Sequence, residues 1–254
     1  MRLDKTFCCP KNAHWKQIEC LQVTDFPLTF SNYQGLRFIE ISGTDAKKFL
    51  QGQLTCNIES LNEGTAQLAA VCTYQGRVIA VMCVYLVKNA YWLQLPEEIA
   101  DDVLTYFKKY AQFSNVELRI VPVDKNSETD SRVTAIKAGI PFIYSATSEK
   151  FTPQMLNLDK LNAIDFKKGC YVGQEVIART HYKGKSKRAL FYSVFEGEED
   201  VTPGIEILVD DEKIGVVVDG RKSDGKLYVL AVLFLAEPAD QVGGRQYFLV
   251  NRSH

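Results

Sequence analysis

The sequence of 254 residues contains few histidines and none of the common catalytic motifs. Its three histidines are His14, His181 and His254, and no pattern marks any of them as the general base of a hydrolase. The sequence also lacks a P-loop, a dinucleotide-binding G-x-G-x-x-G turn and the H-E-x-x-H pattern of zinc proteases. Hydrolysis of nucleotides or of peptide bonds is therefore not predicted.

Long apolar runs are missing as well. No stretch approaches the roughly 20 apolar residues that a membrane-spanning helix needs, and the first residues contain no apolar core of signal-peptide length. No Cys-x-x-Cys pair occurs, and the cysteines are irregularly spaced, at Cys8, Cys9, Cys20, Cys56, Cys72, Cys83 and Cys170. These features predict free thiols in a reducing cytoplasm and no membrane partner.

Several of these cysteines have no predicted function. Cys72 and Cys83 lie in apolar, strand-like stretches and are expected to be inert core residues. Cys8, Cys9 and His14 lie near one another in the sequence, but no fourth ligand follows at a usable spacing. We therefore predict no metal site.

Net charge is almost absent, yet the charges are unevenly distributed. The chain carries −1 in total. Residues 166–190 carry a net charge of +6, which leaves −7 for the remainder of the chain. This segment contains one acid, Glu175, and seven basic residues, which are Lys167, Lys168, Arg179, Lys183, Lys185, Lys187 and Arg188. A basic segment on an acidic protein indicates a bound anion, a polyanionic ligand or an acidic partner. The alternative is a lysine-rich face that is simply solvated.

Hydrophobic periodicity predicts an α+β fold. Strands are expected at 36–43 and 116–123, with three more antiparallel strands within 67–95, and helices at 44–54 and 97–113. The unbroken apolar run 78–87 predicts a strand that is covered on both faces. A polar loop is expected near 124–132. Four short strands after residue 190 predict a small C-terminal β-barrel, so we expect domains at 1–189 and 190–254.

The segment FKKGCYVGQEVIARTHYKGKSKRAL, residues 166–190, combines a thiol with this basic charge. Gly169 and Gly173 flank Cys170, and glycine allows backbone conformations and close approaches that other residues do not. Cys170 precedes an expected helix and follows Lys167 and Lys168, and both features favour a thiolate. A functional cysteine and a cysteine that fills a gap in a turn are equally compatible with this pattern.

The expected helix at 173–182 has one apolar face. Val176, Ile177 and Tyr182 would point inward. Glu175 and Arg179 are four residues apart in the order that favours an ion pair.

The same segment closely resembles the signature of the YgfZ family, whose members share the folate-binding fold of the T-protein of the glycine cleavage system. The K-G-C-Y-x-G-Q-E core, residues 168–175, is long and specific. The stretches ISGTDAKKFLQGQLTCNI, AAVCTYQGRVIAVMCVYL, IKAGIP and PQMLNLDKLNAIDFKKGC extend the likeness over most of residues 36–190. The resemblance implies a T-protein-like antiparallel sheet with helices and ferredoxin-like elements.

The resemblance also implies a function. Family members are accessory proteins that use tetrahydrofolate to assist assembly or repair of iron–sulfur clusters, and their clients include the radical enzyme that thiolates tRNA. By this match Cys170 is the functional thiol, and its motif neighbours are Lys168, Gly169, Tyr171, Gly173, Gln174, Glu175 and Arg179. The thiol would hold a cluster, a persulfide or a mixed disulfide with a client, and the expected link to tRNA is indirect.

The chain departs from the family pattern in ways that affect folate. Its middle region is short, which would open and weaken the folate site. The hairpin lacks the acid that aminomethyl transfer requires, and Lys137 replaces a folate-contacting glutamate. We therefore expect an accessory factor rather than an enzyme. The residues that we align with the folate pocket are Leu36, Tyr74, Ser131, Tyr171 and Arg188.

Two other functions are compatible with the sequence. One is a folate-dependent methyl or aminomethyl transferase, which the fold resemblance suggests and the missing acids oppose. The other is a protein that binds tRNA directly through the basic residues 183–188.

Overall fold

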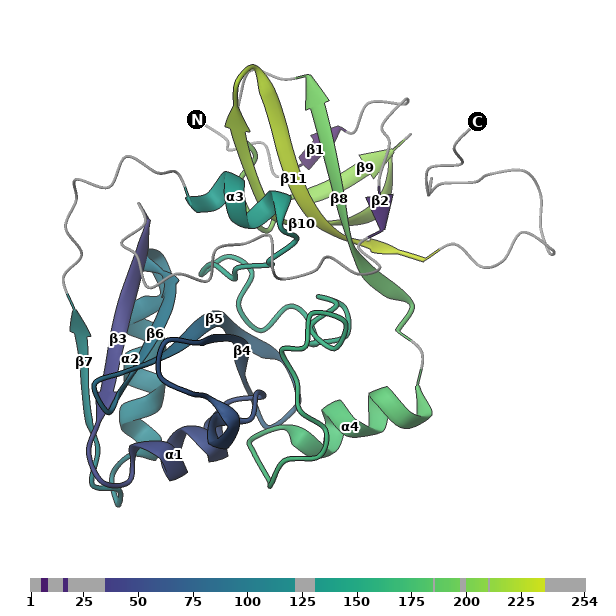
Figure 1. Ribbon diagram of the computed structural model, residues 1–254. Helices are drawn as coiled ribbons and strands as arrows, with labels where there is room; N and C mark the ends of the chain where they lie inside the picture. The colour runs from purple at the N-terminus through teal and green to yellow at the C-terminus, as the bar shows by residue number, and fades with distance from the viewer. Residues whose placement is uncertain are drawn as a thin grey trace.

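The computed structural model describes residues 35–121, 131–184, 186–196, 200–209 and 211–235, together with the backbone of 6–8 and 16–17. Two sheets dominate the molecule, and the helices and long connections lie around and between them (Figure 1). Within these described ranges, no helix is long and apolar enough to cross a membrane.

The N-terminal sheet has five antiparallel strands in the order β4-β5-β6-β3-β7. Its strands are β3 (Leu36–Ser42), β4 (Ala66–Cys72), β5 (Val78–Val87), β6 (Ala90–Pro96) and β7 (Glu117–Val121). All five were predicted from the sequence. The first eight residues of β5 are buried, as expected for an apolar strand that is covered on both faces.

Two predicted helices accompany this sheet. They are α1 (Ala46–Gln53), followed by the short 3-10 helix η2 (Ile58–Ser60), and α2 (Glu97–Tyr110). Helix α2 buries Ile99, Val103 and Phe107, which are spaced so that they share one face. Its first turn carries two acids and its last turn two lysines, an arrangement that the helix dipole favours.

The second sheet has six strands in the order β1-β9-β10-β11-β8-β2. Its strands are β1 (Thr6–Cys8), β2 (Lys16–Gln17), β8 (Arg188–Glu196), β9 (Glu206–Val209), β10 (Glu212–Ser223) and β11 (Lys226–Phe234). Both ends of the chain thus build it, with β1 parallel to β9 and β2 antiparallel to β8. The predicted boundary at 189/190 falls inside β8. The division into two domains and the closure of this sheet into a barrel stay predictions.

Helix α3 (Ser131–Lys137) was not predicted. The polar loop expected near 124–132 overlaps it, because residues 131 and 132 are helical, and residues 124–130 lie outside the described ranges. Hydrophobic contacts explain the helix. Ala135 and Ile136 are fully buried in the main core, whereas the sequence pattern around them is dominated by the polar run that precedes them.

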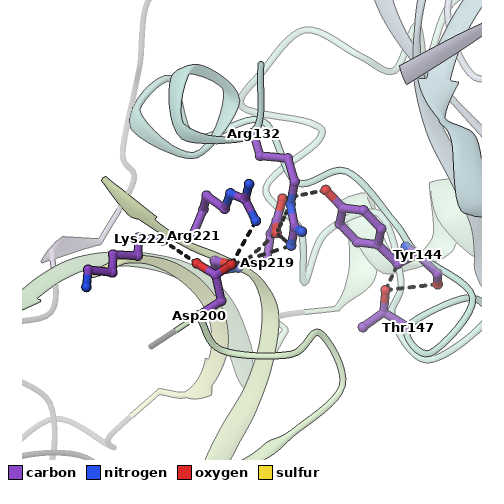
Figure 2. A network of polar contacts seen from close by, with 8 residues as sticks. Arg132, Tyr144, Thr147, Asp200, Asp219, Arg221 and Lys222 are labelled. Atoms are coloured by element: carbon purple, nitrogen blue, oxygen red, sulfur yellow. Dashed lines mark hydrogen bonds and ion pairs between the residues drawn. The ribbon is translucent and has the colours of Figure 1, made fainter. Parts of the chain in front are cut away.

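A buried polar network ties α3 to the second sheet (Figure 2). Arg132 donates through Nε and Nη2 to the carboxylate of Asp219 in β10, whose side chain is fully buried. The Tyr144 hydroxyl donates to the other oxygen of that carboxylate at 2.8 Å. Burial raises the pKa of Asp219, and the guanidinium of Arg132 and the donors around the carboxylate oppose that rise. An outer pair, Arg221 and Asp200, lies beside this network.

The two sheets share one large hydrophobic core. That core includes residues of the N-terminal sheet, of α1 and α2, and of the connection 138–164. It also includes Leu190, Val218, Leu230 and Val232 from the second sheet. A smaller core lies within the second sheet, around Phe191 and Leu233. The connection 138–164, which leads into the basic segment, therefore packs in the core that the two sheets share.

Candidate functional site

Lys168 fixes the cysteine loop to the C-terminal end of α1. Its Nζ donates hydrogen bonds of 2.6–2.7 Å to three backbone carbonyls, those of Gln51, Leu54 and Cys56. The side chain is buried, with 8% of its surface exposed. The last carbonyls of a helix lack helical partners and carry partial negative charge, so an ammonium group satisfies them well. The backbone N–H of Val172 adds a fourth bond, to the Gly52 carbonyl at 3.2 Å.

Burial shifts the proton equilibria at this anchor. It lowers the pKa of Lys168 to about 8, against the effect of nearby acidic groups. The Tyr171 ring lies beside the ammonium, with Nζ 5.1 Å from the ring centroid. Burial raises the pKa of Tyr171, so its hydroxyl stays protonated. That hydroxyl is buried and has no hydrogen-bond partner among the described residues.

Gly173 allows the motif to meet the turn between β4 and β5. It has φ of +84° and caps the N-terminus of α4 (Gln174–Lys183). A Cβ atom there would lie 2.5 Å from the Thr73 carbonyl oxygen, so no other residue fits without a backbone shift. A Cβ on Gly169 would meet nothing within 4 Å. Only the second glycine of the motif is thus sterically required.

Cys170 is exposed and opens onto a groove beside α1. The groove has a volume of about 450 Å³ and is lined by Thr44, Lys47, Lys48, Gln51, Gly52, Glu59, Gly169 and Cys170. The cations in it come from α1. From the sequence, Lys168 was expected to lie beside the thiol and favour the thiolate. In the structure its ammonium group is instead held by the three carbonyls.

The remaining motif residues lie on or near α4. Gln174 donates through Nε2 to the Lys168 carbonyl at 3.4 Å. Glu175 and Arg179 form the expected ion pair at 3.6 Å, and both are largely exposed, so the pair contributes little to stability.

The predicted inward face of α4 is only partly correct. Ile177 is buried, with 1% of its surface exposed, but Val176 is 40% exposed and Tyr182 is 69% exposed. The helix lies at the edge of the N-terminal sheet beside the β4–β5 turn, where only one of its faces is covered (Figure 1).

The five residues aligned with a folate pocket lie on different elements. Leu36 is buried at the start of β3, and Tyr74 is 75% exposed in the β4–β5 turn. The Arg188 guanidinium lies 4.2 Å from the centroid of the Phe234 ring. Ser131 begins α3, and its side chain is outside the described set. Among the four whose side chains are described, Tyr171 is the one that combines burial with an unpartnered polar atom, which fits a polar ligand group.

Sequence reasoning missed the side chains that hold the chain in place on either side of the motif. Thr55 is fully buried, donates to the Ala163 carbonyl at 2.6 Å and accepts from the Ala70 N–H at 2.9 Å. Gln154 donates to the Ile177 carbonyl at 2.8 Å. These contacts join segments far apart in the sequence, so no local pattern announces them. The groove lysines, Lys47 and Lys48, could have been noticed in the sequence. They are adjacent cations in a predicted helix that also contains Gly52, another residue of the groove.

The other described cysteines are not accessible to a reaction partner. Cys56, Cys72 and Cys83 are buried, and burial raises the pKa of Cys56 and of Cys83 to about 12. Cys72 and Cys83 are therefore core residues, as predicted. In the described part of the chain, no group of three or more His, Cys, Asp or Glu side chains is placed to hold a metal. The side chains of Cys8, Cys9 and His14 lie outside it.

The chain is similar in sequence to several known bacterial proteins. No protein-family model matches the chain. An uncharacterized protein of Haemophilus influenzae is 30% identical over 249 residues, covering 81% of this chain and 88% of that protein. The tRNA-modifying protein YgfZ of Klebsiella pneumoniae is 29% identical, with 82% and 85% covered. The protein of that name from Sodalis glossinidius is 26% identical, with 84% and 87% covered.

A solved structure shares the fold. The glycine cleavage system aminomethyltransferase T of Bartonella henselae matches with a TM-score of 0.55 at 12% identity. The match covers 87% of this chain and 78% of that one. At this identity the likeness establishes the fold alone.

Proposed function

The chain belongs to the YgfZ family, and on that premise we propose that it is a folate-binding accessory protein for assembly or repair of iron–sulfur clusters in the cytoplasm. In this proposal its clients include the radical enzyme that thiolates tRNA. The relatives from Klebsiella pneumoniae and Sodalis glossinidius are tRNA-modifying proteins by name, which supports a client class that acts on tRNA. The protein's own contribution would be a thiol presented to the client.

One observation carries this proposal. Of the four cysteines whose side chains are described, only Cys170 is exposed. It lies on a loop that Lys168 holds against α1, at the edge of a groove with two lysines. A thiol that reaches a partner must be accessible, and its loop must be held in place so that the sulfur meets the partner reproducibly. The Lys47 and Lys48 charges would attract an acidic client surface.

Tetrahydrofolate fits the proposal through Tyr171. Its buried, protonated hydroxyl is available for a hydrogen bond to a polar group of the ligand. Bound tetrahydrofolate would supply a reduced pterin that carries one-carbon units. Lys137, at the position of the folate-contacting glutamate, lies 4.5 Å from the centroid of the Tyr228 ring. This contact gives no support to aminomethyl transfer, so we propose no such activity.

The function is tested in a bacterial strain that lacks its own YgfZ. The readout is the fraction of thiolated tRNA nucleosides, measured by mass spectrometry. Wild-type protein should restore thiolation, and Cys170→Ser should not. Lys160→Met, which removes an exposed cation outside the motif, is the matched control and should restore it. Full rescue by Cys170→Ser at equal protein level would refute the proposal.

Folate binding is tested separately by calorimetry. We expect tetrahydrofolate to bind at micromolar concentration, with about tenfold weaker binding to Tyr171→Phe, since one buried hydrogen bond is worth about 1 kcal/mol or more. Absence of heat with the wild-type protein would remove folate from the proposal and leave the Cys170 test intact.

A further inference from the structure

The exposed end of α4 carries an aromatic cluster that the proposed function does not use. The His181 ring stacks on Phe166, with centroids 3.8 Å apart and an interplanar angle of 17°. Tyr182 contacts both rings, at 4.9 Å from His181 and 6.1 Å from Phe166. Tyr182 is nevertheless 69% exposed, and His181 is exposed as well. The His181 ring stabilises the end of the helix through its stack on Phe166, whereas most of the Tyr182 ring stays in water.

The flanking charges are mainly positive. From residue 166 to 190, where all but residue 185 are described, four exposed side chains carry positive charge: Lys167, Arg179, Lys183 and Lys187. Glu175 is the one exposed acid among them. Lys183 follows Tyr182 directly, Lys167 follows Phe166, and Arg179 precedes Tyr182 by one turn of the helix. Exposed rings and cations thus lie close together at this end of α4, where Arg179 also pairs with Glu175.

We propose that this surface, formed by Phe166, Arg179, His181, Tyr182 and Lys183, binds single-stranded RNA. Bases stack on exposed aromatic rings, and lysine and arginine neutralise the adjacent phosphates. An acidic protein surface would use the cations equally well and can also pack on aromatic rings. The combination of exposed ring faces with neighbouring cations is the pattern typical of sites that bind single-stranded nucleic acid, and it favours that ligand. The Phe166–His181 stack holds the helix end against the loop and leaves Tyr182 as the accessible stacking ring.

This inference goes beyond the iron–sulfur proposal, because it gives the protein its own RNA contact in place of an indirect link. It also differs from the basic segment 183–188 predicted from the sequence. The predicted segment contains no aromatic residue, whereas the inferred surface is centred on Tyr182, which the sequence analysis had placed inside the protein.

The test is fluorescence anisotropy of a labelled 15-nucleotide single-stranded RNA, titrated with the full chain at low and moderate salt. We expect binding that weakens with salt. Tyr182→Ala should weaken it about tenfold, because loss of one stacked base lowers affinity by roughly 5- to 150-fold. Tyr182→Phe, which keeps the ring, should stay within about twofold of wild type. Lys183→Glu should weaken binding and reduce its salt dependence.

Phe113→Ala is the matched control, because Phe113 is 99% exposed beyond the end of α2 and lies on another part of the molecule. It should leave the affinity unchanged. No binding of the RNA at low salt would overturn the inference. Binding that Tyr182→Ala does not alter, and that polyglutamate displaces, would also overturn it and would identify the surface as a site for acidic proteins. Neither outcome depends on Cys170, a cluster or folate.

Discussion

At the scale of single residues, the four cysteines whose side chains the structure describes comprise one accessible thiol and three buried ones. Cys56 and Cys83 are buried in the core, and burial raises the pKa of each to about 12. A thiol must lose its proton to react, so these two stay unreactive at any physiological pH. Cys170 is instead exposed and lies at the groove beside α1.

We therefore predict selective alkylation of the native protein. Brief treatment with iodoacetamide at pH 8, followed by peptide mapping, should modify Cys170 and leave Cys56, Cys72 and Cys83 below a few per cent. The buried thiols should become labelled only in denaturant. Labelling of Cys83 at a rate comparable to Cys170 would show that the core opens, contrary to the structure.

Lys168 is the residue on which the position of Cys170 depends. Lys168→Met keeps the aliphatic chain but leaves three buried carbonyls without their donor, which should lower the free energy of unfolding by about 3 kcal/mol. Lys167→Met removes an exposed charge and should change it by less than about 0.5 kcal/mol. Urea unfolding of both variants measures the difference. Equal stability of the two would contradict the anchoring role.

At the scale of elements, α4 depends on how closely its N-cap residue, Gly173, approaches the β4–β5 turn. Gly173→Ala forces a left-handed φ on alanine and a clash with the Thr73 carbonyl, and it should cost about 2 kcal/mol or more. Gly169→Ala, in open space four residues earlier, should be close to neutral. Thermal unfolding followed by circular dichroism distinguishes them. A neutral Gly173→Ala would mean that α4 is docked differently.

Periodicity predicted the regular elements well and long-range contacts poorly. The strands within 67–95 and the helix at 97–113 have strong apolar patterns, and each appears where expected. Strands β1 and β2 have three and two residues and form only because a distant sheet edge pairs with them. The bonds of Lys168 cross more than 100 residues of sequence. The inward face expected for Tyr182 was wrong because only one side of α4 is covered.

At the scale of the whole molecule, α3 and the second sheet are joined through Asp219. Its carboxylate accepts hydrogen bonds from Arg132 and Tyr144, so Asp219→Asn removes the buried charge that pairs with the partly buried Arg132 guanidinium. We expect a loss of about 3–5 kcal/mol. Asp200→Asn, in the outer pair with Arg221, should cost at most about 1 kcal/mol. Chemical denaturation measures both, and a mild effect at Asp219 would show that the two sheets are held together mainly by their shared core.

The central claim is that Cys170 is the thiol through which this protein serves iron–sulfur enzymes. The experiment that tests it most directly uses a purified radical enzyme that thiolates tRNA. This enzyme is exposed to air in the presence of tetrahydrofolate and of this YgfZ-family protein, and the visible absorbance of its iron–sulfur cluster is followed over time. Wild-type protein should slow the loss of absorbance several-fold, Lys160→Met should do the same, and Cys170→Ser should give no protection. Equal protection by Cys170→Ser would contradict the claim.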